Sequence, residues 1–237
     1  MMISLVGGGG KTATMFYIGN FFANMGKKVI ITTSTHIVKP DKFVEIKSAK
    51  ELCNISFGDE PVVVGIDDGK KLSSLPVPEL EKFKDYADVV LVEADGAKRL
   101  PIKIPREENE PVIPKCSDVC IVCMGIDAVG KTLKEKCFRY ERAYDIFGWS
   151  EEHILTCEDV ARILTSKYAG LKGVDDLRTV FVINKADKGT DLEKALEVKN
   201  YIEYYCKESG LKNFRVAITS YESKREFCDF DFLTEGK

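Results

Sequence analysis

The sequence has 237 residues, of which 44% are hydrophobic and 31% are charged, an ordinary globular composition that argues against disorder. A formal net charge of -3 gives no broad basic surface of the kind that draws proteins to nucleic acid, and no apolar run approaches the ~20 residues of a membrane helix. We therefore expect one domain over residues 1–237, cytoplasmic, with no nucleic-acid or membrane partner.

The first elements in chain order form a strand, a loop, a helix and a second strand. A short apolar run at 3–6 is followed by glycines, by apolar positions at helical spacing over 13–25, and by a β-branched run at 29–32. This spacing suits a parallel crossover, so the chain is expected to open with a β-loop-α-β unit.

The later elements continue the alternation. Further strands are predicted at 61–64, 89–92, 119–123, 180–183 and 216–218, and helices at 158–168 and 191–207. Thr156 with Asp159, and Thr190 with Glu193, have the spacing of capping boxes for these helices. The order predicts a doubly wound α/β fold with a mostly parallel sheet of P-loop NTPase type, and an irregular segment at about 97–115.

A glycine run between the first strand and the first helix is the main candidate for a phosphate site. It consists of Gly7, Gly8, Gly9, Gly10, Lys11 and Thr12. Glycines let the backbone curl around phosphate oxygens, and the following helix N-terminus favours negative charge. Lys11 is expected to reach the terminal phosphates and Thr12 to ligate magnesium. The loop is two residues shorter than the common phosphate loop.

A second stretch, residues 125–132, matches the full G-x-x-x-x-G-K-S/T pattern and also follows a predicted strand. We interpret it as a coincidental match. Ile126 and Val129 restrict the backbone turn, and the Asp127 carboxylate would repel phosphate. It also lies too far along the chain for the remaining nucleotide motifs to follow it in order.

An acidic turn follows the predicted strand at 89–92. Glu93 and Asp95 stand at the carboxyl end of that strand, where open α/β sheets bind ligands. With Thr12 they supply enough oxygen ligands for magnesium, directly or through water. Lys98 and Arg99 come just beyond and are candidates for stabilising charge on a transferred phosphoryl group, although both side chains could equally be solvated.

The base of the nucleotide has its own candidate motif. Asn184, Lys185 and Asp187 follow a predicted strand and read N-K-x-D, the guanine-recognition motif of GTPases. An aspartate accepts hydrogen bonds from the ring N–H and the exocyclic amine of guanine, whereas adenine offers neither donor there. The sequence therefore favours GTP over ATP, with Mg²⁺ as the accompanying ion.

Cysteine and histidine do not indicate a metal centre. Cys116, Cys120 and Cys123 have a C-x3-C-x2-C spacing, but strand alternation would place Cys120 and Cys123 on opposite faces, so we interpret them as core residues. His36 follows the second strand and is either a cleft residue or a plain loop residue. The eight cysteines are expected to be reduced.

Several of these segments together resemble the YqeC-like family. They are 6–12, the threonine-rich turn ending at His36, V-E-A-D-G-A-K-R-L-P at 92–101, E-P-V-I-P at 110–114, G-I-D-A-V-G-K at 125–131 and N-K-A-D at 184–187. The resemblance spans nearly the whole chain. It implies an accessory factor of selenium-dependent molybdenum hydroxylases, with the hydroxylase or its maturation factors as partners. It also implies that Asp95, Lys98 and Arg99 lie beside the phosphates, where they could hold an anionic second substrate or report hydrolysis to a partner.

Three kinds of activity remain open from the sequence. The first is a magnesium-dependent GTPase or ATPase whose hydrolysis assists maturation of a partner enzyme, with Lys11, Glu93, Asp95 and Arg99 as its catalytic groups. The second is a small-molecule kinase or ligase that activates a selenium or cofactor intermediate. The third is a binding module that nucleotide gates without being hydrolysed.

Overall fold

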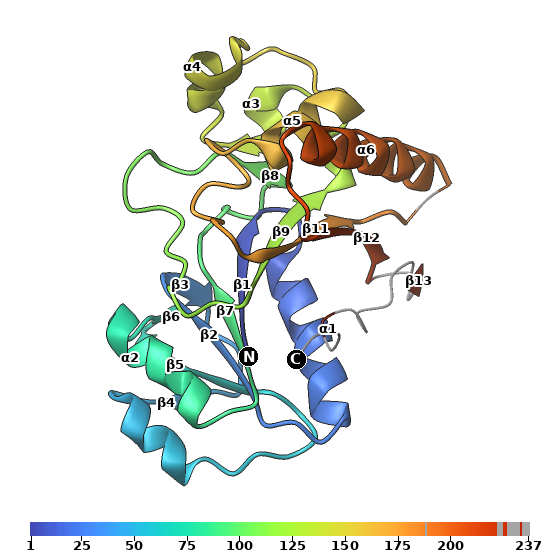
Figure 1. Ribbon diagram of the computed structural model, residues 1–237. Coiled ribbons are helices and arrows are strands. Elements are labelled where there is room, and N and C mark those ends of the chain that lie inside the picture. The colour runs from blue at the N-terminus through green and yellow to red at the C-terminus, as the bar shows by residue number, and fades with distance from the viewer. Residues whose placement is uncertain (188, 222–224, 227–232, 234–237) are drawn as a thin grey trace. The chain divides into compact units, whose positions relative to one another are not determined.

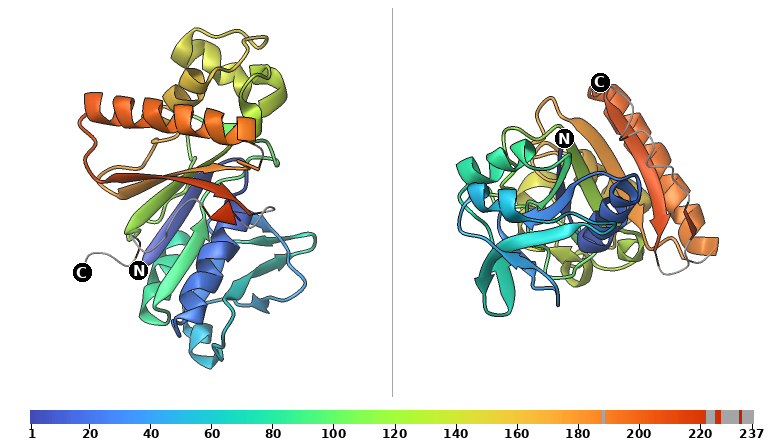
Figure 2. Two further views of the ribbon diagram at one scale, coloured as in Figure 1. Left: turned by 90° about the vertical axis from the view of Figure 1, so that its right-hand side faces the viewer. Right: turned by 90° about the horizontal axis from the view of Figure 1, so that it is seen from below.

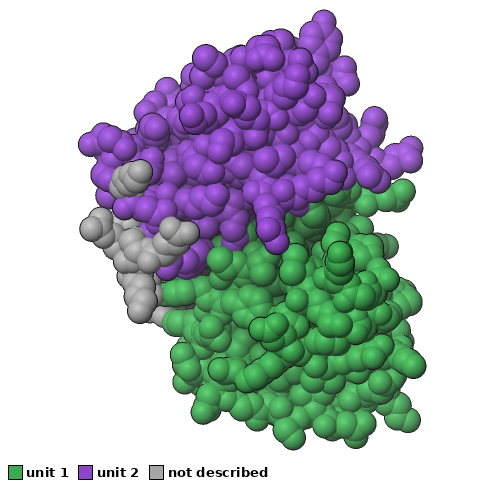
Figure 3. All heavy atoms as spheres, turned by 180° about the vertical axis from the view of Figure 1, so that it is seen from behind, with its two compact units in different colours: residues 1–6, 11–96, 109–120 green, residues 7–10, 97–108, 121–237 purple. Residues whose placement is uncertain are grey.

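The computed structural model describes residues 1–187, 189–221, 225–226 and 233. Two compact units divide these residues between them (Figure 3). Unit 1 contains residues 1–6, 11–96 and 109–120, and unit 2 contains residues 7–10, 97–108 and 121–237. Each unit is therefore assembled from several separate stretches of the chain.

Unit 1 is built on a sheet with the order β1-β7-β2-β5-β6-β3, and β4 also pairs with β5 (Figure 1). Its strands are β1 (Met2–Gly7), β2 (Val29–Thr33), β3 (His36–Val38), β4 (Val44–Glu45), β5 (Val62–Asp68), β6 (Lys71–Ser73) and β7 (Val89–Glu93). The β1–β7, β7–β2, β2–β5 and β4–β5 pairs are parallel. The β5–β6 and β6–β3 pairs are antiparallel and form the edge.

Helix α1 and three shorter helices accompany this sheet. They are α1 (Lys11–Asn24), α2 (Val77–Glu81) and the 3-10 helices η1 (Ala49–Asn54) and η2 (Lys82–Asp85). Met15, Ile18 and Phe22 recur at helical spacing and are buried, which directs one face of α1 onto β2 and β7. A separate core cluster packs Phe83 and Leu52 against Val64. Burial of both faces explains why β2 and β7 each begin with consecutive apolar residues.

Unit 2 has its own strand order, β13-β12-β11-β9, and a separate two-stranded ribbon of β8 and β10. These strands are β8 (Ile102–Lys103), β9 (Val119–Gly125, beginning in unit 1), β10 (Cys137–Phe138), β11 (Arg178–Asn184), β12 (Phe214–Ser220) and β13 (Arg225–Glu226). The β11–β12 and β8–β10 pairs are parallel, and β13 is antiparallel to β12. The parallel β11–β12 pair places the carboxyl ends of both strands at one edge.

The helices of unit 2 include α5 and α6, which pack against each other, and α6 also contacts β12 (Figure 2). The full set is η3 (Ile126–Ala128), α3 (Leu133–Lys136), η4 (Tyr140–Arg142), α4 (Ala143–Phe147), α5 (Cys157–Thr165) and α6 (Gly189–Glu208). Thr156 caps α5 as predicted, because its side chain accepts from the Asp159 amide and the Asp159 carboxylate accepts from the Thr156 amide. The box predicted at Thr190 is wrong, because α6 already includes Gly189 and Thr190 lies inside the helix.

The predicted α/β fold with a mostly parallel sheet is confirmed. The runs expected as strands at 3–6, 29–32, 89–92, 119–123 and 180–183 all lie within observed strands. The segment expected to be irregular at 97–115 contains only the two residues of β8 as regular structure. Among the described residues, no helix combines the length and apolar character needed to cross a membrane.

Candidate functional site

The glycine run is held tightly inside unit 2. The Gly8 amide donates to the Cys123 carbonyl at 2.9 Å, and the Gly9 amide donates to the Leu100 carbonyl at 3.0 Å. A Cβ added at Gly9 would lie 1.9 Å from the Gly125 nitrogen, and Gly9 has a positive φ of 65°. Only glycine fits there. The amide groups of Gly8 and Gly9 are therefore engaged by backbone carbonyls of unit 2.

The two residues after the glycines contact the acidic turn within unit 1. The Lys11 ammonium group is 3.1 Å from Asp95 Oδ1, and both side chains are almost fully buried. Thr12 Oγ1 donates to Glu93 Oε2 at 3.1 Å, while Thr12 itself is exposed. These four residues, which sequence reasoning selected from segments more than 80 positions apart, therefore meet in pairs.

The threonine-rich turn after β2 positions the acidic turn. Thr33 Oγ1 donates to the Glu93 carbonyl at 2.8 Å, and the Ser34 amide donates to the same oxygen at 3.1 Å. The Val112 amide donates to the Ala94 carbonyl at 3.0 Å. Backbone hydrogen bonds on both sides thus hold the end of β7 in place.

The residues of the N-K-x-D motif form a second connected group, within unit 2. Asn184 Nδ2 donates to the Gly9 carbonyl at 2.8 Å, and Asn184 Oδ1 accepts from Thr219 Oγ1 at 3.1 Å. Ser220 Oγ donates to Asp187 Oδ1. The motif is therefore tied to the glycine run by Asn184 and to the end of β12 by two hydroxyl groups.

Lys185 points to a different partner. Its ammonium group is 3.1 Å from Asp127 Oδ1, and its backbone has a φ of 67°, in the left-handed region. Asp127 also lies 3.4 Å from Lys136. Lys185 therefore forms an ion pair with a carboxylate of the second glycine-lysine stretch, residues 125–132.

Sequence reasoning missed Thr219 and Ser220. Both hydroxyl groups follow the apolar part of β12, whose register sets Ile218 opposite Ile183 on β11. Parallel neighbours end at the same edge, so polar residues after one strand meet polar residues after the other. That signal was present in the sequence, as a Thr-Ser pair directly after a predicted strand.

The second glycine-lysine stretch has a different geometry. Residues Ile126–Ala128 form the 3-10 helix η3, and Thr132 caps the four-residue helix α3 in a capping box with Glu135. The hydroxyl group of Thr132 is thereby engaged. This geometry argues against a phosphate loop at 125–132.

The two cationic residues beyond the acidic turn have exposed side chains and unusual backbones. Lys98 and Arg99 have φ angles of 48° and 64°. Within the part of the chain that the structure describes, Arg99 forms no hydrogen bond or ion pair. The expected contact of Arg99 with a phosphoryl group stays a prediction.

The positions of the cysteines and of His36 are those of core and surface residues. Cys120 and Cys123 are buried in β9, as expected of core residues, and Cys116 Sγ lies 3.5 Å from Met2 Sδ. His36 lies on β3, is exposed, and is 3.9 Å from Asp68. Among the described residues, no group of three or more His, Cys, Asp or Glu side chains is placed to hold a metal ion.

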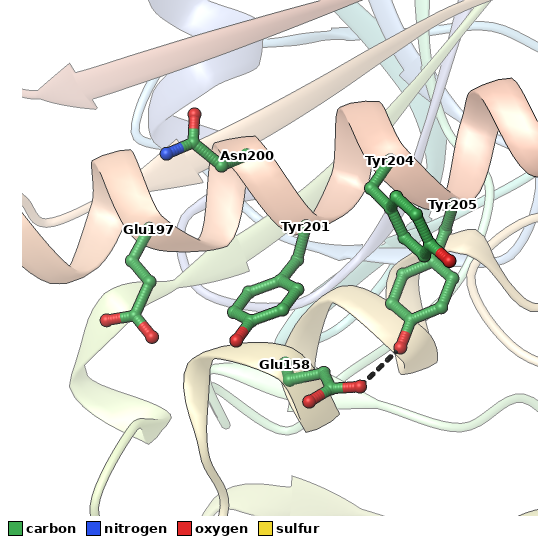
Figure 4. Close-up of a pocket in the computed structure, with 6 residues that line it drawn as sticks. All are labelled: Glu158, Glu197, Asn200, Tyr201, Tyr204 and Tyr205. Carbon is green, nitrogen blue, oxygen red and sulfur yellow. Dashed lines mark hydrogen bonds between the residues drawn. The ribbon is translucent and has the colours of Figure 1, made fainter.

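A surface pocket of about 430 Å³ lies between α5 and α6 of unit 2 (Figure 4). Its lining residues are Glu158, Glu197, Asn200, Tyr201, Tyr204 and Tyr205. Tyr205 Oη donates to Glu158 at 2.6 Å. Burial, together with this carboxylate, raises the pKa of Tyr205 to about 12. None of the predicted site residues lines this pocket.

The fold and these contacts define an α/β protein with a glycine run at the end of β1. Polar side chains lie at the ends of β7, β11 and β12. The model of the YqeC protein family matches residues 3–141. The chain belongs to this family. It is also 28% identical over 194 residues to a protein of Escherichia coli K12 named "Uncharacterized protein YqeC", covering 78% of this chain and 75% of that protein.

Proposed function

We propose that this protein is a magnesium-dependent P-loop GTPase that assists the maturation of a molybdenum hydroxylase, including the insertion of selenium. The observation that carries the nucleotide part is the hydrogen bond from Asn184 to the Gly9 carbonyl. It joins the segment proposed to read the base to the loop proposed to hold the phosphates. An asparagine that served only a surface turn would not form a buried hydrogen bond to the glycine run.

The base preference rests on the carboxylate of Asp187. Ser220 donates to one of its oxygens and limits its rotation. An oriented carboxylate can accept from the two neighbouring donors of guanine, and adenine would leave it unpaired. This arrangement supports GTP over ATP.

The phosphate part rests on Lys11 and the first turn of α1. A nucleotide cradled by the loop has its terminal phosphates beside the residue that follows Gly10. Lys11 is paired with Asp95, so phosphate binding would exchange one anionic partner of the ammonium group for another. Asp95 would then be released near the reacting phosphoryl group, which would couple binding to a change at the acidic turn.

The residues present fit a magnesium ion. Thr12 Oγ1 and Glu93 Oε2 are 3.1 Å apart, close enough to contact one ion together. Both are oxygen donors, which magnesium prefers, and it keeps water in its remaining positions. When bound, the ion would neutralise charge on the phosphates. Asp95 would contribute through water or through its exchange with Lys11.

The maturation role rests on the family resemblance in the V-E-A-D-G-A-K-R-L-P stretch. The test of the whole proposal is calorimetric titration with GTP and with ATP, each with and without magnesium, followed by phosphate release with and without a molybdenum hydroxylase. We expect tighter binding of GTP, dependence on magnesium, and phosphate release stimulated by the hydroxylase. No binding of either nucleotide would refute the proposal, and binding without release would leave a gated binding module.

A further inference from the structure

The pocket between α5 and α6 combines aromatic rings with carboxylates (Figure 4). Glu197, Tyr201 and Tyr205 follow one another at intervals of four residues on α6, so they share one face of that helix. Glu158 on α5 is bonded to Tyr205 at 2.6 Å. Tyr201 therefore stands between the Glu197 carboxylate and the bonded pair of Tyr205 and Glu158. The cavity of about 430 Å³ thus has an aromatic ring between two carboxylates.

Both carboxylates are bonded to neutral donors. Glu158 accepts from the Tyr205 hydroxyl group, and burial, together with this carboxylate, raises the pKa of Tyr205 to about 12. Glu197 accepts from the Cys157 thiol, and burial, followed by this hydrogen bond, raises the pKa of that thiol to about 11. Both donors keep their protons at neutral pH. Neither glutamate forms an ion pair with another described residue, so each retains an uncompensated negative charge.

The cations of the two helices do not supply that compensation. None of the lysine or arginine residues of α5 and α6 is among the residues that line the pocket. The Arg162 guanidinium group lies 5.1 Å from the Trp149 ring centroid and 5.8 Å from the Phe147 centroid. The Lys199 ammonium group lies 3.9 Å from Glu203. A cation that enters from outside therefore meets no like charge among the lining residues.

This combination of groups favours a guanidinium group over other cations. A guanidinium group is planar, so it can stack on the face of a tyrosine ring, and its donors lie at its edges, where they reach carboxylates. An ammonium group has no flat face. Each glutamate is exposed and has further acceptor positions beyond the one that its neutral donor occupies. The ring of Tyr201 and the two carboxylates therefore match an arginine side chain.

The exposure of the pocket favours a protein as the source of that side chain. A small-molecule site buries most of its ligand. Here Glu158 and Glu197 are exposed, and Tyr204, which also lines the pocket, is 57% exposed. An arginine delivered by another protein would be covered by that protein's own surface. Tyrosine and arginine are also the residue types that contribute most at protein interfaces.

We propose that the pocket between α5 and α6 is a docking site for an arginine side chain of a partner protein, whose guanidinium group stacks on Tyr201 between Glu197 and Glu158. The pocket shares no residue with the candidate nucleotide site. The inference therefore goes beyond the proposed function and does not depend on nucleotide binding.

The test is NMR titration of the full chain with acetyl-Gly-Arg-Gly-amide, followed through the tyrosine ring signals. We expect saturable binding, weakened about tenfold or more when citrulline, a neutral isostere, replaces arginine in the peptide. Glu197→Gln and Tyr201→Leu should each weaken binding about threefold or more, whereas Tyr201→Phe keeps the ring and should retain most of it. Two controls outside the pocket, Glu203→Gln on α6 and Tyr144→Leu on α4, should change nothing.

Three results would overturn the assignment. They are no binding of the arginine peptide to the wild type, binding that neither Glu197→Gln nor Tyr201→Leu weakens, and binding of free L-arginine as tight as that of the peptide. The last would assign the pocket to a small molecule. Because Glu197 is exposed, its variant keeps the test decisive even if Tyr201→Leu does not fold. The titration contains no nucleotide, so its outcome is separate from that of GTP binding.

Discussion

Residues 7–10 and residues 125–132 both offer glycines followed by Lys and Thr at the end of a strand, yet the structure treats them differently. In the first stretch each added Cβ would lie within 2.5 Å of another atom of unit 2. In the second, Gly130 has open space around its Cβ position, and the Thr132 hydroxyl group caps a helix. The shorter motif is thus the one in which every glycine is sterically required.

The comparison teaches that steric need identifies a loop better than its pattern of letters. A glycine that faces solvent can be retained for a turn alone. Gly7, Gly8 and Gly9 instead face backbone atoms and Gly10 faces the Asn184 side chain, which fixes one loop path. The second stretch instead contains Asp127, which pairs with Lys185 and Lys136. It serves as an anionic anchor for the N-K-x-D segment.

The largest expected effect comes from adding one methyl group to the first loop. Gly9→Ala would place Cβ 1.9 Å from a backbone nitrogen at a positive φ, so we expect it to lower the free energy of unfolding by more than about 4 kcal/mol. Gly130→Ala, also at positive φ but with nothing within 4 Å, should cost about 1–2 kcal/mol. Urea denaturation measures both. Equal losses would remove the steric distinction between the two stretches.

The second effect concerns the two lysines. Lys11→Ala should weaken nucleotide binding by roughly 10- to 150-fold, because a charge-assisted contact contributes about 1.5–3 kcal/mol. Lys131→Ala, the lysine of the second stretch, is exposed and should leave affinity unchanged. Calorimetric titration with GTP compares the two variants. If Lys131→Ala weakened GTP binding as much as Lys11→Ala, residues 125–132 would become a candidate for the phosphate loop.

The third effect tests the segment that both stretches contact. Asp187→Asn should reduce the preference for GTP over ATP at least tenfold, because the amide replaces an acceptor with a donor. Ser220→Ala should reduce it less, by about threefold, since it removes only the hydrogen bond that orients the carboxylate. Competition between the two nucleotides measures the ratio. A wild type without any preference contradicts the base assignment.

The fold was predictable where the chain is regular and buried. The apolar runs of β2, β7 and β11 are fully covered, so hydrophobicity alone located them. Shorter elements escaped prediction: β6 and the β8–β10 ribbon have two or three residues per strand, too few for a period to show. The β8–β10 pair also depends on a partner far along the sequence, whereas β6 pairs with the adjacent strand β5.

The candidate site was predictable in its residue types but not in its connections. The sequence indicated Lys11 and Asp95 separately, while their 3.1 Å contact depends on the register of β1 with β7. The contacts of Lys98 and Arg139 with the Phe138 ring gave no signal in the sequence, because the two cationic residues are 41 positions apart. Local patterns thus identified candidate groups, and tertiary pairing decided their partners.

The smallest effect separates the two threonines that end the two stretches. Thr132→Ala removes a helix cap and should lower the free energy of unfolding by about 1 kcal/mol without altering nucleotide affinity. Thr12→Ala should do the reverse, reducing the magnesium dependence of GTP binding with little change in stability. Denaturation and titration of both variants distinguish the roles, and matching profiles would contradict the comparison.

The Thr132 effect should also depend on pH. The Thr132 hydroxyl and amide groups donate to Glu135 and lower the pKa of its carboxyl group. A lowered pKa stabilises the fold above the carboxyl group's ordinary value of 4.5, and this contribution is lost as pH falls through the lowered folded value. The difference in stability between wild type and Thr132→Ala should therefore shrink on acidification below pH 4.5. A difference that is constant with pH would mean that the threonine cap acts without its glutamate partner.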